Sequence, residues 1–81
     1  HDVTNALPLI ETEMGNEYII LSIPPEDQEL LTYLVHNNLV PGANLKVLEL
    51  SKTRGVILIQ CENQDITFSN MVASKIIVVP K

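Results

Sequence analysis

The hydrophobic positions along this chain follow two different periods. Short apolar or alternating runs bounded by turn-forming residues are typical of β-strands, and they occur at residues 18–23, 44–50, 56–61, 66–68 and 75–79. Residues 26–37 differ, because their apolar side chains recur at helical spacing and share one face. That face consists of Leu30, Leu31, Leu34 and Val35.

The connections between these segments carry their own signals. Asn38 is placed to end the helix in the left-handed conformation, and Leu39 to fold back onto the last helical turn. Pro41-Gly42 then turns the chain into the strand 44–50. In that strand Leu48 and Leu50 break the alternation, which predicts a bulge or burial on both sides.

Further turns are predicted at Gly15–Asn16, at Arg54–Gly55 and at 62–64, with a single helical turn at 69–74. The pattern predicts a mainly β fold: a small, partly open barrel of five or six short strands with one inserted helix. Residues 1–8 show no period and end in proline, so we interpret them as a linker or arm that leads into a domain at 9–81.

The composition limits the possibilities. The chain has 81 residues, enough for one small domain, and three aromatics among 46% hydrophobic residues predict an aliphatic core. Apolar runs reach only four residues, so no membrane insertion is expected, and no signal peptide is visible. The chain begins with His, which suggests processing or a fragment of a longer protein.

Charge is unevenly distributed around a net value of −5. Residues 1–45 contain seven acids and no Lys or Arg, whereas residues 46–81 contain all five bases and three acids. Without a basic stripe, direct contact with nucleic acid is not expected. The acidic half could attract a cation or a basic partner, or simply form a solvated surface.

Few residues offer chemistry. Cys61 lies in an apolar strand and is interpreted as a small buried hydrophobe, and His1 and His36 are the only histidines. The glycines stand alone in turns, so no phosphate-binding loop is formed. No catalytic constellation is present, and the chain is not expected to be an enzyme.

Two small clusters remain as candidates. Glu26 and Glu29 stand one turn apart and could share a hard cation, although carboxylates at a helix start are also explained by the helix dipole. His36 is at the far end of the same helix. Tyr33 and Phe68 could line a peptide groove, but two aromatics are few for that role and core packing is favoured.

The run EDQELLTYLVHNNLVPGANLKVLE, the Gly55-Val56 hairpin and the ending ITFSNMVASKIIVV together resemble the FeoA-like SH3 domain. The resemblance covers residues 9–79. Its motif positions are Leu39, Pro41-Gly42, Leu45, Val47, Ala73, Ile76 and Val78. It implies an SH3-like barrel, and it is stronger towards the C-terminal domain of repressors similar to the diphtheria toxin repressor than towards the stand-alone FeoA accessory of ferrous iron transport.

The resemblance also implies partners. In the repressor family, missing N-terminal parts would bind DNA and Fe²⁺ or Mn²⁺ in a cytoplasmic homodimer, and this domain would dock within the same polypeptide. Some of these repressors donate Glu and Gln ligands from just before the helix, where this chain has Ser22 and Pro25. Neither replaces such a ligand, so no metal, cofactor or catalytic residue is assigned. Asn38 stands where the family has glycine.

Overall fold

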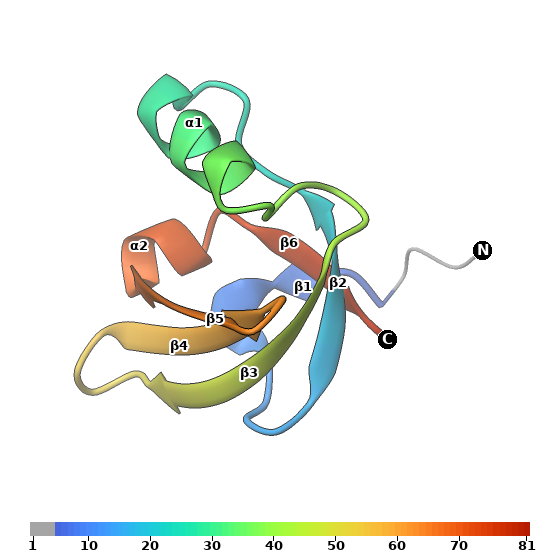
Figure 1. Cartoon of the computed structure of the whole chain (residues 1–81). Helices are drawn as coiled ribbons and strands as arrows, with labels where there is room; N and C mark the ends of the chain where they lie inside the picture. Colours follow the sequence, from blue (N-terminus) through green and yellow to red (C-terminus); the bar gives the residue numbers. More distant parts are fainter. Residues whose placement is uncertain (1–4) are drawn as a thin grey trace.

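A computed structural model describes residues 5–81 as a small SH3-like barrel with one main helix (Figure 1). In chain order the elements are β1 (Leu7–Pro8), the 3-10 turn η1 (Leu9–Glu11), β2 (Glu17–Ser22), α1 (Gln28–His36), β3 (Asn44–Ser51), β4 (Val56–Cys61), β5 (Gln64–Ser69), α2 (Asn70–Ala73) and β6 (Ile77–Pro80). The predicted class, mainly β with one inserted helix, is confirmed.

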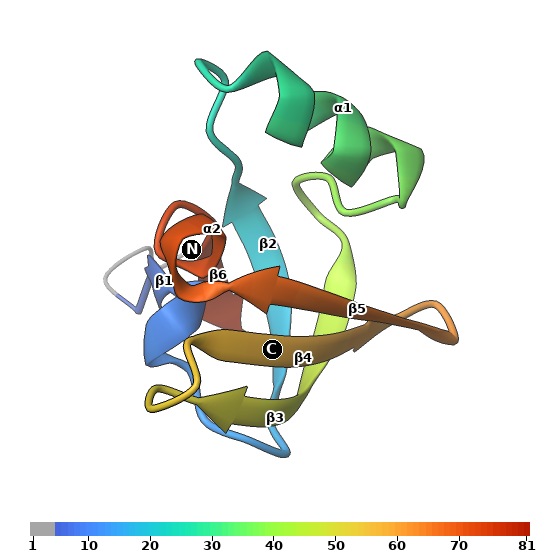
Figure 2. The ribbon, with the colours of Figure 1, turned by 90° about the vertical axis from the view of Figure 1, so that its left-hand side faces the viewer.

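The six strands form one antiparallel sheet in the order β1-β6-β2-β3-β4-β5. The sheet curls on itself, and α1 stands at one end of it in both views (Figures 1 and 2). The irregularity predicted in the strand 44–50 is confirmed, since the register between β3 and β4 shifts between Val47 and Glu49. Leu48 and Leu50 are both partly buried there.

Inward-facing aliphatic side chains from every long strand fill the barrel. Val47, Ile57, Ile59 and Val78 are fully buried, and Leu9, Leu34 and Leu39 close the ends of the core. Burial of each such side chain is worth about 1.5–3 kcal/mol relative to exposure. The buried side chains that alternate with exposed ones along β4 and β5 therefore supply much of the stability of the barrel.

The amino-terminal segment is more ordered than its sequence suggests. Leu7 and Pro8, within the predicted arm, pair with Val78 and Ile77 of β6, and Leu9 is completely buried. A two-residue strand is too short to give a periodic signal, so sequence could not reveal it. His1 lies outside the described residues, and the division of the chain into arm and domain stays a prediction.

Helix α1 begins later than predicted. Its first residue is Gln28, and the Asp27 carboxylate accepts a hydrogen bond from the Leu30 N–H at 3.1 Å. This side-chain cap satisfies a backbone donor that has no partner inside the helix. It makes Asp27 the capping residue, so the helix begins at Gln28 and not at Glu26. The last strand also starts later, at Ile77, because the Lys75 N–H still bonds to Val72 at the end of α2.

The end of α1 confirms the predicted cap. Asn38 has a φ of 65°, in the left-handed region. Its N–H donates to the Val35 carbonyl at 3.1 Å, and the Leu39 N–H donates to Leu34 at 2.8 Å, the two bonds of a Schellman motif. Leu34 and Leu39 are both buried, so the hydrophobic contact expected with this motif has its two members in the core.

Candidate functional site

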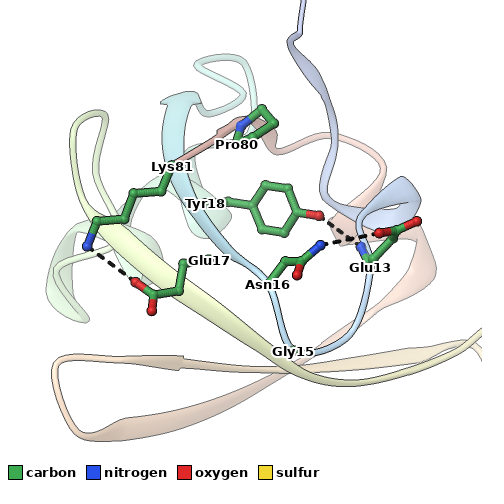
Figure 3. A pocket seen from close by; sticks show the side chains of 7 residues that line it. All are labelled: Glu13, Gly15, Asn16, Glu17, Tyr18, Pro80 and Lys81. Carbon is green, nitrogen blue, oxygen red and sulfur yellow. Dashed lines mark hydrogen bonds and ion pairs between the residues drawn. The ribbon is translucent and has the colours of Figure 1, made fainter.

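A hollow in the surface lies beside the turn that precedes β2, near the end of β6 (Figure 3). It is an open, polar depression of about 630 Å³. Its lining consists of Glu13, Gly15, Asn16, Glu17, Tyr18, Pro80 and Lys81. Sequence reasoning identified the Gly15–Asn16 turn but not this set, because β6 brings Pro80 opposite Tyr18 only in the folded sheet.

Internal hydrogen bonds hold the walls of this hollow. The buried Tyr18 hydroxyl accepts from the Glu13 N–H at 3.0 Å, and the Asn16 amide donates to the Glu13 carboxylate at 3.2 Å. Gly15, with a φ of 86°, makes the tight turn and donates its N–H to Val47 at 2.7 Å. These contacts give Tyr18 a structural role in fixing the turn.

The outer side of the hollow carries an ion pair. Lys81 Nζ lies 3.2 Å from Glu17 Oε1, with both side chains about half exposed. Such a pair contributes at most about 1 kcal/mol. The lining contains carboxylates, an amide and a phenol, without a histidine or cysteine, so it offers no nucleophile–base pair of the usual kind.

The carboxylates singled out by sequence lie at the start of α1. Glu26 and Glu29 are exposed, and Asp27 between them caps the helix and lies 3.9 Å from Lys75. Within residues 5–81 no group of three His, Cys, Asp or Glu side chains is close enough to hold a metal ion. His36, at the other end of α1, therefore does not complete a three-ligand set with them.

Ser22 and Pro25 stand just before the helix, where the family resemblance placed the ligand positions. Ser22 ends β2 and is exposed. The Pro25 carbonyl accepts a hydrogen bond from the Gln28 side chain at 3.1 Å. A hydroxyl and an engaged carbonyl are poor substitutes for a carboxylate and a carboxamide as metal ligands.

Cys61 is held away from solvent at the end of β4. Only 1% of its surface is exposed, and burial, with a smaller contribution from the charge of Glu62, raises the pKa of its thiol. A raised pKa leaves less of the reactive thiolate at neutral pH. The residue packs as part of the core.

Helix α1 leaves part of its apolar surface uncovered. Leu34 is its one fully buried residue, and Leu30 packs against the core from a partly buried position. The apolar side chains of Leu31 and Val35 instead join Thr32 and His36 around a shallow, mainly apolar depression of about 340 Å³. We call these four residues the outer face of α1. Val35 is 52% exposed.

Tyr33 lies on another side of the helix. Its ring meets the ring of buried Phe68 edge-on, with centroids 6.2 Å apart and an angle of 83°. Tyr33 itself is 46% exposed, so the prediction of core packing is correct for Phe68 and wrong for Tyr33. Only Leu34 of the helix is fully buried against the barrel, so the ring of Tyr33 stays about half exposed. A hydrogen bond from the Gln64 side chain to Asn37 holds the end of α1 to the β4–β5 hairpin.

No helix within residues 5–81 is long and apolar enough to cross a membrane.

Comparison with known proteins identifies the family. The model of the FeoA domain matches residues 7–80, nearly the whole chain. A search of curated protein sequences found no match. Among solved structures, an iron uptake regulatory protein, FeoA, superposes with a TM-score of 0.83 at 26% identity, over 94% of this chain and 99% of that one.

Solved repressors share the fold but are longer. A manganese-dependent transcriptional repressor superposes with a TM-score of 0.86 at 21% identity, over 94% of this chain. ScaR with bound Cd²⁺ superposes with a TM-score of 0.78 at 27% identity, over 93% of this chain. The chain spans only 42% and 35% of the lengths of those two proteins. The family match and these superpositions agree with the barrel described above, and the chain belongs to the FeoA domain family.

Proposed function

We propose that this chain is the C-terminal regulatory and interaction domain of an iron- or manganese-dependent transcriptional regulator, and that it docks onto other parts of the same polypeptide through the outer face of α1. The observation that carries this proposal is the apolar character of that exposed face, with Leu31 and Val35 one helical turn apart. An apolar surface that the fold leaves uncovered is typical of an interaction site.

A small apolar surface is sufficient for docking when both partners belong to the same polypeptide. Within one polypeptide the partner surface is present at a high effective concentration, so a few apolar contacts can be populated without high intrinsic affinity. If the face docks in only one of two states of the regulator, docking shifts the equilibrium between them. The domain then acts without a ligand of its own, and Fe²⁺ or Mn²⁺ binds elsewhere in a cytoplasmic homodimer.

The experiment uses the complete protein. We expect Val35→Asp to shift the metal concentration at which the regulator binds its operator by about fivefold or more, the lower range of allosteric couplings. Met14→Asp is the matched control, since Met14 is also exposed but lies near the turn before β2. Equal shifts in the two variants, or none, would contradict docking through α1.

The second candidate is a stand-alone FeoA-type accessory of ferrous iron transport. The superposition over 99% of the solved FeoA chain favours it, because that protein consists of this domain alone. The full-length open reading frame separates the two proposals. A winged-helix pattern upstream supports the regulator, whereas a start codon near residue 1 supports the accessory.

A further inference from the structure

The two edges of the sheet differ. Strand β1 forms one edge with two residues, the second of which, Pro8, has no N–H to donate. Strand β5 forms the other edge with six residues, no proline, no lysine and an uninterrupted register against β4. Proteins usually protect a strand edge by shortness, proline, charged side chains (lysine above all) or a bulge. β5 carries one charged residue, Asp65, and none of the other devices.

The hairpin geometry shows which backbone groups point outward from β5. Glu62 and Asn63 both have positive φ, 52° and 67°, as in a two-residue type I′ turn, so the flanking Cys61 and Gln64 form a hydrogen-bonded pair. Bonded and non-bonded pairs then alternate along the antiparallel ladder. The Asn70 N–H donating to the Gly55 carbonyl at 2.9 Å, at the far end of the ladder, has the phase that this alternation requires.

Asp65 and Thr67 therefore occupy the non-bonded positions opposite Gln60 and Leu58, and their backbone N–H and C=O groups point away from β4. Among residues 5–81, no turn, loop or cap hydrogen bond engages these groups. Helix α1 contacts β5 through Phe68 and Gln64 instead. Those residues belong to the inward-facing set of the strand, the opposite phase from Asp65 and Thr67.

We propose that the β5 edge binds an extended, basic polypeptide segment as an additional antiparallel strand. Unpaired backbone groups in a regular row are the recognition element for strand addition. Charge selects the occupant: Asp65 is exposed on the outer face, Glu62 is exposed in the adjoining turn, and neither β5 nor that turn contains a base. A second copy of the chain, with its own net charge of −5, is a poorer occupant.

The geometry also fixes the phase of the added strand. A residue directly opposite Asp65 or Thr67 pairs through its backbone and has its side chain on the outer face, so basic residues belong there. The residues between them point inward, towards the side of β5 that carries Ile66 and Phe68. The exposed ring of Tyr33 on Phe68 is an apolar surface next to which a branched aliphatic side chain can pack.

The probe is a terminally blocked peptide in which valine and lysine alternate, titrated into the isolated chain by NMR. We expect the amide signals of Asp65 and Thr67 to shift and their hydrogen exchange to slow. N-methylation of the lysine residues removes the donors on the pairing edge and should weaken binding by about tenfold or more. N-methylation of the valine residues, on the other edge, should leave binding unchanged.

A charge-reversal pair completes the test. Asp65→Lys should weaken binding of the unmethylated peptide by about threefold or more, whereas Glu49→Lys, an exposed position on β3, is the control and should not. Equal affinity of the two methylated peptides, or no shift in β5 at millimolar peptide, would overturn the proposal. Shifts in β5 that depend on protein concentration without peptide would assign the edge to a second copy and would also overturn it.

Discussion

Strand β4 and helix α1 each carry five hydrophobic residues, yet the fold uses them differently. Ile57, Ile59 and Cys61 of β4 are at most 1% exposed, whereas in α1 only Leu34 is fully buried. A strand in the middle of a curled sheet has one whole side facing the core. A helix at the end of the barrel presents a narrow stripe to it and leaves the rest of its apolar surface uncovered. Buried apolar side chains are therefore concentrated in the barrel, whereas α1 leaves Tyr33 and Val35 about half exposed.

The largest expected difference between the two regions comes from one truncation made in each. Val47→Ala, at a fully buried position of β3 opposite β4, should lower the free energy of unfolding by about 2 kcal/mol or more, since it removes buried methyl groups and leaves a cavity. Val35→Ala, in α1, should change it by less than about 0.5 kcal/mol, because the side chain is half exposed and alanine is a better helix former.

Urea melts of the two variants measure both values. A cost at Val35 comparable with that at Val47 would mean that α1 is packed as firmly as the barrel, and the contrast between the two regions would be wrong.

A smaller effect is expected at the joint between the two regions. Asn38→Gly should be neutral or slightly stabilising, and Asn38→Val should destabilise by about 1 kcal/mol or more, since a β-branched side chain is strained at a φ of 65°. Denaturant melts give the ranking. If valine and asparagine proved equally stable, the Schellman cap would not contribute to holding α1 in place.

The smallest expected effect concerns metal at the start of α1. The isolated chain should not bind Fe²⁺ or Mn²⁺ at micromolar concentration, because Glu26 and Glu29 are solvated and Asp27 already caps the helix. Calorimetric titration of the chain, repeated with Glu26→Gln and Glu29→Gln, measures this. Tight binding that both substitutions abolish would make the domain a direct metal sensor.

The sequence predicted the barrel well because its signals are local. The strand 56–61 coincides with β4, the break at Leu48 and Leu50 marks the bulge, and Asn38 forms the left-handed cap. Each of these features depends on residues only a few positions apart in the sequence. Turn-forming residues and the period of hydrophobic side chains predict structure over that distance.

The residues of the candidate site were harder to predict from the sequence, because they are brought together by contacts between distant segments. Pairing of β2 with β6 brings Tyr18 opposite Pro80, and Lys81 comes within 3.2 Å of Glu17. The helical pattern identified an apolar face on α1 but not which part of it the barrel covers. The structure shows that Leu34 is buried in the core while the neighbouring Val35 is exposed, and the sequence pattern does not distinguish the two.

Hydrogen exchange tests the central claim, that α1 is the docking element on a stable barrel, most directly. The full-length regulator proposed above and this chain alone would be compared in the presence of Mn²⁺, following peptides that cover α1 and β4. We expect exchange in residues 28–36 to slow in the full-length regulator, while exchange in residues 56–61 stays the same. Unchanged exchange in α1 would contradict the account.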